Sequence, residues 1–112
     1  MNRLDVLVEL VELRKPLAEI ADNISKLEWD YDGEPLIISS NQVKNIIERY
    51  LSGVLSDREL EEWANLIECR EDIDFEESNR NEIEYIIYSL SNPELEGDIS
   101  VESCKSLLAT LT

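Results

Sequence analysis

Histidine is absent from this chain, and glycine, proline and cysteine are scarce. Without histidine the chain lacks the commonest general base and the commonest metal-binding imidazole, which excludes serine–histidine and cysteine–histidine catalysis. The three glycines stand apart from one another, so the chain has no glycine-rich phosphate-binding loop. No apolar run approaches the roughly 18 residues that a membrane-spanning helix needs. We therefore expect a soluble protein that is not an enzyme.

The two cysteines, Cys69 and Cys104, lie far apart on segments that read as helical. Neither a CxxC redox pair nor a zinc site can be assembled from them. Near the amino terminus, Asp5, Glu9 and Glu12 interrupt the apolar pattern, which a signal peptide does not tolerate. These features predict a cytoplasmic protein with reduced cysteines, no metal and no other cofactor.

Positive charge is also scarce, with 10 Lys and Arg against 26 Asp and Glu, for a net charge of −16. Residues 57–112 contain 16 acids and four bases, a net charge of −12, whereas residues 1–56 carry −4. Such a field repels nucleic-acid phosphates and anionic lipid surfaces and speeds the encounter with basic proteins. We expect a basic protein partner and no direct contact with nucleic acid or membrane. Acidity that serves only solubility is the alternative.

Apolar residues recur at spacings of three and four from Val6 to Leu27, the pattern of one helix face. Pro16 lies inside this stripe, where its ring removes one hydrogen bond of a helix. Because the stripe stays in register across Pro16, we expect two abutting helices or one kinked helix, without a change of direction.

Serine residues mark the starts of the later helices. Ser39 with Gln42, and Ser56 with Glu59, form capping-box patterns. Ser100 reads as the N-cap of a last helix with five apolar positions on its inner face, namely Val101, Cys104, Leu107, Leu108 and Leu111.

Two further apolar faces complete the helical pattern. The helix after Ser56 should bury Leu60, Trp63, Ala64 and Ile67. A fourth helix, which Asn92 and Pro93 end, should bury Ile83, Ile86, Ile87 and Leu90. Residues 36–38 could form a short extended stretch, and residues 68–77 read as a loop or a helix end. Residues 1–112 are thus predicted to be a single all-α domain, an antiparallel bundle of about five helices with short connections.

The stretch EWDYDGEPLIIS, residues 28–39, has part of the pattern of a calcium-binding EF-hand loop. Asp30 and Asp32 occupy loop positions 3 and 5, and Gly33 occupies position 6. Position 12 is Ser39, where an EF-hand has a bidentate glutamate, and a serine here is better suited to capping the next helix. We expect an acidic turn at this place and no calcium site.

Six acidic residues of the carboxyl-terminal half define a candidate partner-binding surface, which we call the acidic ridge: Glu61, Glu62, Glu68, Glu71, Asp72 and Asp74. Like charges at positions i and i+4 destabilise a helix by a few tenths of a kcal/mol, and few lysines or arginines interleave here. A charge run can be an ordinary solvated face, but this arrangement favours a basic partner. A carboxylate pair can also hydrolyse glycosides, yet a chain of this size leaves little room for the required cleft.

The segment IIERYLSGVLSDRELEEWANLIE, residues 46–68, resembles the helical hairpin of colicin D-type bacterial immunity proteins. The acidic stretch, the following helix and EGDISVESCKSLLATL, residues 96–111, fall in a similar order, so that the resemblance covers about residues 43–111. It implies a small all-helical protein that occupies the basic catalytic cleft of a toxin in the place of RNA.

Two hypotheses of function follow. The first is an immunity or antitoxin-like inhibitor whose acidic ridge binds the basic catalytic site of a nuclease toxin. The second is a small acidic interaction module or adaptor that binds through the exposed side of the hairpin between residues 39 and 67. A basic partner surface and a neighbouring toxin-like reading frame would distinguish the first from the second.

Overall fold

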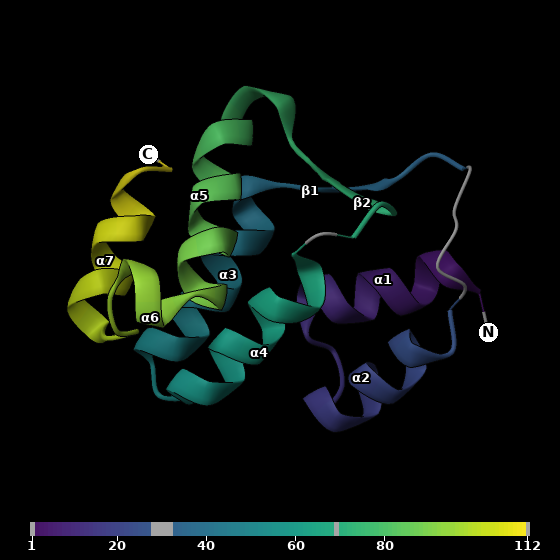
Figure 1. Cartoon of the computed structure of the whole chain (residues 1–112), viewed down its shortest axis with the longest axis horizontal. Helices are drawn as coiled ribbons and strands as arrows, with labels where there is room; N and C mark the ends of the chain where they lie inside the picture. The colour runs from purple at the N-terminus through teal and green to yellow at the C-terminus, as the bar shows by residue number, and fades with distance from the viewer. Residues whose placement is uncertain (1, 28–32, 69, 112) are drawn as a thin grey trace.

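The computed structural model of the chain describes residues 2–27, 33–68 and 70–111. Within those residues it contains seven α-helices and one two-stranded parallel sheet (Figure 1). The prediction of a mainly helical fold is therefore confirmed, whereas the prediction of a purely helical bundle of about five helices is not.

The elements follow one another as α1 (Arg3–Glu12), α2 (Leu17–Ser25), β1 (Leu36–Ile38), α3 (Ser40–Leu51), α4 (Asp57–Ile67), β2 (Ile73–Phe75), the short 3₁₀ helix η1 (Glu77–Asn79), α5 (Arg80–Ser91), α6 (Pro93–Glu96) and α7 (Val101–Ala109).

The first two helices form a hairpin, which corrects the expected straight path across Pro16. Leu13 ends α1 in the left-handed helical conformation, with φ of 47°. Pro16 then occupies the N-cap position of α2. The two helices consequently pack side by side (Figure 1). The apolar stripe stays in register because both helices turn it toward the same core, and periodicity alone does not separate this arrangement from one long helix.

Serine caps begin three of the helices, as the capping patterns predict. The side chain of Ser39 accepts a hydrogen bond from the Gln42 amide, and the Gln42 side chain accepts one from the Ser39 amide. Ser56 and Glu59 make the same reciprocal pair at α4, and Ser100 caps α7. Each pair satisfies two amide groups that a helix start would otherwise leave without partners.

A two-stranded parallel sheet joins two segments that we expected to be an extended stretch and a loop. The strands pair from Leu36 opposite Ile73 to Ile38 opposite Phe75. The Leu36 amide donates to the carbonyl oxygen of Asp72 at 2.9 Å, just before β2 begins. Helices α3 and α4 form the connection between the two strands. Pairing between segments so distant in the sequence leaves no local pattern, and three-residue strands show little alternation.

The last helices differ from the prediction at two places. Pro93 ends α5 as expected, but it also begins the additional short helix α6, in which proline at the first position needs no amide hydrogen. On α7, Cys104 and Leu107 are buried, whereas Val101 is 49% exposed; Leu111, just after the helix, is buried as well. The expected burial of Val101 is therefore wrong, because it lies on the outer side of the first turn.

Trp63 lies at the centre of the core, with none of its surface exposed. Its neighbours on α4, Leu60, Ala64 and Ile67, are buried as well. The indole Nε1 donates a hydrogen bond to the carbonyl oxygen of Leu10 in α1 at 3.0 Å. A buried tryptophan N–H needs such a partner. Trp63 thus connects α4 to the end of α1, which confirms its predicted role as a core anchor.

Replacing Trp63 with alanine should lower the free energy of unfolding by about 3–5 kcal/mol, because it removes a large buried side chain. Urea denaturation followed by circular dichroism measures this change. Val54→Ala is the control, since Val54 is 67% exposed in the link between α3 and α4 and should change stability by less than about 0.5 kcal/mol. An unchanged denaturation midpoint for Trp63→Ala would contradict the core assignment.

Candidate functional site

Helix α4 presents the first two residues of the acidic ridge to solvent. Its buried positions lie on one face, so Glu61 and Glu62 project from the other, with Glu62 exposed and Glu61 half-buried. Glu71 follows in the turn before β2 and is exposed. None of these three carboxylates pairs with a lysine or arginine in the described part of the chain. All three are accessible, and the only base near Glu61 and Glu62 on α4 is Arg58, one turn earlier.

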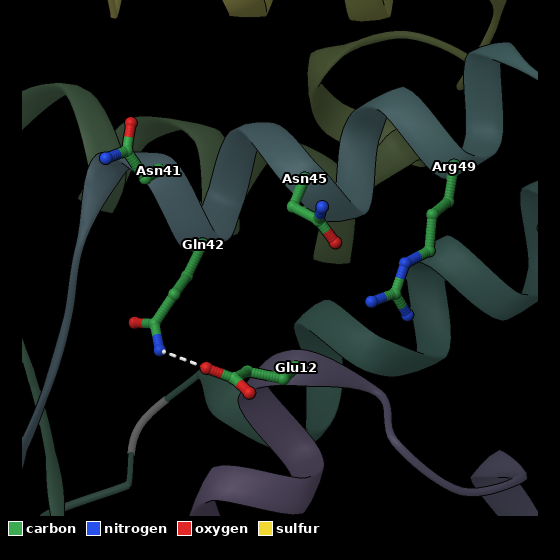
Figure 2. A pocket seen from close by; sticks show the side chains of 5 residues that line it. All are labelled: Glu12, Asn41, Gln42, Asn45 and Arg49. Carbon is green, nitrogen blue, oxygen red and sulfur yellow. Dashed lines mark hydrogen bonds between the residues drawn. The ribbon is translucent and has the colours of Figure 1, made fainter.

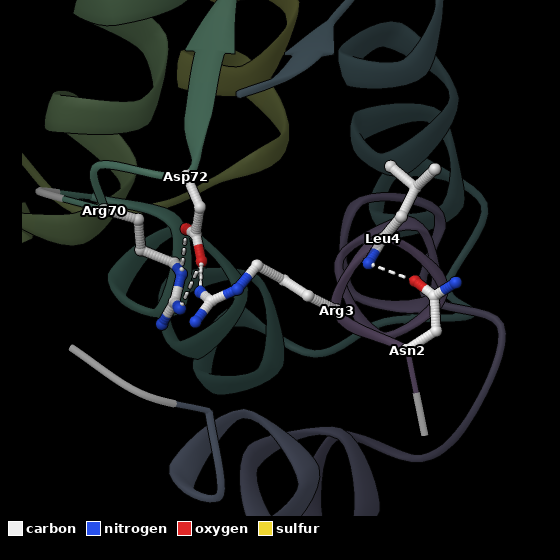
Figure 3. Close-up of polar contacts among 5 residues, drawn as sticks. All are labelled: Asn2, Arg3, Leu4, Arg70 and Asp72. Atoms are coloured by element: carbon white, nitrogen blue, oxygen red, sulfur yellow. Dashed lines mark hydrogen bonds and ion pairs between the residues drawn. The ribbon is translucent and has the colours of Figure 1, made fainter. Parts of the chain in front are cut away.

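Asp72 differs from the rest of the acidic ridge because its side chain is buried, with an exposure of 3%. Arg3 in the first turn of α1 and Arg70 before β2 both donate to its carboxylate (Figure 3). Arg70 Nε lies 2.7 Å from Oδ1 and its Nη2 lies 2.9 Å from Oδ2. The expectation that Asp72 is exposed is therefore wrong. Its partner Arg3 is 69 residues away, so no local pattern could indicate the pairing.

The pKa of Asp72 reflects two opposing effects. Burial raises this pKa, because a low-dielectric surrounding disfavours the charged carboxylate. Hydrogen bonds and positive charge from Arg70, and then from Arg3, act in the opposite direction and prevail. The pKa of the carboxyl consequently lies below its ordinary value, and Asp72 stays charged inside the protein.

Asp74 and Glu68 are also engaged within the chain. Arg80 at the start of α5 forms an ion pair with Asp74, with Nη2 lying 3.1 Å from Oδ2. This hydrogen bond, followed by one from the Phe75 amide, lowers the pKa of Asp74. Glu68 accepts a hydrogen bond from the Ser91 hydroxyl and so joins the end of α4 to the end of α5. Both residues are half-buried.

The structure therefore divides the acidic ridge into two groups. Asp72, Asp74 and Glu68 hold secondary-structure elements together through named partners. Glu61, Glu62 and Glu71 have no such task in the described part of the chain. The six residues do not form one continuous exposed face, although all belong to α4 and the segment that follows it.

Helix α5 adds exposed residues that the sequence interpretation overlooked. Its buried face consists mainly of isoleucines, and Glu84, Tyr85 and Tyr88 lie on the opposite face. Tyr85 is 50% exposed and Tyr88 is 41% exposed. The helical periodicity could have identified these side chains, because the positions between the buried isoleucines must face outward.

A polar cleft of about 340 Å³ lies between the end of α1 and α3 (Figure 2), and it is lined by Glu12, Asn41, Gln42, Asn45 and Arg49. Gln42 Nε2 donates to Glu12 Oε2 at 3.0 Å, a contact that lowers the pKa of Glu12. Arg49 Nη1 donates to the carbonyl oxygen of Leu13 at 3.1 Å. Both charged residues of the cleft are thus used to hold α1 and its left-handed turn against α3.

The described residues contain no group of three or more cysteine, aspartate or glutamate side chains placed to hold a metal ion. Asp30 and Asp32 of the EF-hand-like stretch lie outside the described residues, as does Cys69. Ser39, at position 12 of that stretch, caps α3 as predicted. None of the described helices has the length and apolar character needed to cross a membrane.

The chain has no significant match among protein-family models, curated proteins or solved structures.

Replacing Asp72 with asparagine should destabilise the fold by about 3 kcal/mol, the lower end of the range for breaking a buried ion pair. We expect the lower end because Arg3 and Arg70 are about one-fifth exposed and keep part of their hydration. Urea unfolding of both proteins near neutral pH measures the difference. Glu71→Gln, an adjacent exposed position, is the matched control and should behave like the parent.

The same substitution should alter the pH dependence of stability. Because the pKa of Asp72 is lowered in the folded protein, its ion pairs stabilise the fold above the ordinary carboxyl pKa of about 3.9. This contribution is lost as pH falls through the lower pKa of the folded protein. The difference between parent and Asp72→Asn should thus shrink on acidification. A difference that stays constant down to about pH 2 would contradict the charged state of Asp72.

Proposed function

We propose that this chain is an antitoxin-like inhibitor, without catalytic activity of its own, that binds the basic catalytic site of a nuclease toxin. The contacts assigned to it are Glu61, Glu62 and Glu71. Glu68 and Asp74 lie at the border of this surface, and Asp72 supports it from below. The proposal places the protein in the bacterial cytoplasm, where RNA is the substrate that a nuclease toxin attacks.

The observation that carries the proposal is the uneven use of positive charge. Residues 57–112 contain only four bases, and Arg70 and Arg80 are both committed to carboxylates of the scaffold. Glu61, Glu62 and Glu71 form no ion pair within the described residues, and Arg58, one turn before Glu61 and Glu62 on α4, is a single base beside two acids. A folded surface of this kind favours association with a positively charged protein over association with nucleic acid.

Carboxylates can replace phosphates in a nuclease site because arginine and lysine side chains donate hydrogen bonds to both groups in similar geometry. The capping box at Ser56 and the buried Trp63 hold α4 in place, so the backbone that carries these carboxylates needs no ordering when a partner binds. Pre-ordering of this kind raises affinity by lowering the entropic cost of association. The resemblance of residues 43–111 to colicin D-type immunity proteins supports the same conclusion.

The proposal is tested on the proteins encoded beside this chain in its genome of origin, together with ribonuclease domains of known colicin D-type toxins. Each basic domain is purified and its cleavage of RNA is measured with and without one equivalent of this chain. We expect stoichiometric inhibition of at least one domain. Changing Glu61, Glu62 and Glu71 to lysine should slow association about tenfold or more at low salt, with a smaller difference at high salt.

A variant with the same net charge is the matched control. It changes Asp5, Glu48 and Glu102 to lysine, which are exposed and lie on α1, α3 and α7. If it loses inhibition as completely as the first variant, total charge and not the assigned surface determines binding. If neither neighbouring nor known toxin domains are inhibited by the parent, the proposed function is wrong, and an adaptor role becomes the better hypothesis.

A further inference from the structure

Helix α5 exposes two aromatic rings on one face. Tyr85 and Tyr88 are separated by three positions, so they are neighbours on the helix surface, and they are 50% and 41% exposed. The opposite face of the helix is fully used in the core, where Ile83, Ile86 and Leu90 are at most 1% exposed. The tyrosines are therefore on the outer side because of the register of the helix.

The chain leaves about half of each tyrosine uncovered. The two hydroxyl groups make no hydrogen bond in the described structure. Tyrosine combines a large apolar surface with a polar tip and loses little conformational freedom when it is covered, which explains its enrichment among the residues that dominate binding energy. Two adjacent exposed tyrosines thus indicate a contact surface.

The negative charge around the two tyrosines favours a positively charged partner. Glu84 precedes Tyr88 by four positions, which places its carboxylate beside that ring, and Glu84 is exposed. The nearby cation Arg80 forms its ion pair with Asp74, and its charge also attracts Glu84, one turn later on α5. The exposed Glu94 and Glu96 of α6 follow a short distance along the chain and have no cation partner in the described residues. A second copy of this chain, with a net charge of −16, would be repelled here.

We propose that Glu84, Tyr85 and Tyr88 form the central contact of the inhibitor with its partner and that they receive an arginine of the basic nuclease surface. This inference rests on the proposed function and deepens it. The guanidinium plane stacks on the ring of Tyr88, where cation–π attraction operates, and its N–H groups donate to the Glu84 carboxylate. Lysine fits this place less well, because its ammonium group cannot stack.

Hydrogen bonds connect the carboxyl-terminal end of α5, where Tyr88 lies, to Glu68 of the acidic ridge. The Tyr88 carbonyl oxygen accepts hydrogen bonds from the Ser91 hydroxyl at 3.1 Å and from Asn92 Nδ2 at 2.9 Å. Ser91 also donates to Glu68 at the end of α4. The end of α5 is consequently fixed against α4, so Tyr88 keeps a fixed position relative to the α4 carboxylates.

The test uses the nuclease domain that the full chain inhibits, and it measures affinity by calorimetry and inhibition by RNA cleavage. Tyr88→Ala should weaken binding about 30-fold, the effect typical of a dominant interface residue, and Tyr85→Ala should weaken it in the same direction. Tyr88→Phe keeps the ring face and should stay within about threefold of the parent. Val54→Ala, at an exposed apolar residue distant in sequence, is the control. Thermal melting checks that every variant is folded.

The outcomes separate this inference from the proposed function. If the parent inhibits the nuclease and both tyrosine variants bind equally well, the inference is wrong and the proposed function stands. If the parent inhibits no domain, the proposed function fails and the inference fails with it. If sedimentation shows a dimer of the chain that Tyr88→Ala dissolves, the surface receives a second copy and the assignment to a nuclease is overturned.

Discussion

The carboxylate of Asp72 lies inside the protein, where an unpaired charge is strongly unfavourable. Arg3 and Arg70 approach it from two directions and neutralise it. The backbone carbonyl of the same residue accepts the hydrogen bond from Leu36 that begins the parallel sheet. One residue therefore joins α1, the segment after α4 and the start of the parallel strand pair.

The pairing of arginines with buried and half-buried carboxylates also affects the charge of the surface. Once Arg70 pairs with Asp72 and Arg80 pairs with Asp74, the remaining carboxylates of the carboxyl-terminal half outnumber the remaining bases. The carboxylates that stabilise the fold are thus different residues from the carboxylates that are available to a partner. Glu61, Glu62 and Glu71 can change with little effect on stability, whereas Asp72 cannot. A change of partner would therefore require few changes in the core.

The parts of the fold that sequence reasoning predicted are those that local signals encode. Ser39, Ser56 and Ser100 each mark a helix start because the cap and its partner lie within three residues. The burial of Trp63 follows from its place on a continuous apolar stripe. In both cases the contacts or the periodicity that decide the structure fall within one helix. They can therefore be recognised in the sequence.

The parts that sequence reasoning missed depend on contacts between distant residues. The strands β1 and β2 are recognisable only as a pair, and the burial of Asp72 depends on Arg3 at the other end of the chain. The turn after α1 was missed because Leu13 adopts the left-handed conformation without being a glycine, with its carbonyl held by Arg49. For the candidate site, the missed pairing with Arg3 meant that Asp72 was placed on the surface. The tyrosines of α5 were overlooked for another reason, since the local helical periodicity already places them outward.

The parallel pairing of β1 with β2 has a consequence for how the chain folds. Parallel strands cannot be joined by a tight turn, and here the connection contains both α3 and α4. The entropy of closing this long loop must be overcome before the strand hydrogen bonds contribute any stability. Helices α3 and α4, which have local caps, can form earlier and shorten the effective loop. The sheet thus belongs to the late steps of folding, and the amide hydrogen of Leu36 should exchange with solvent when its hydrogen bond to the Asp72 carbonyl oxygen opens.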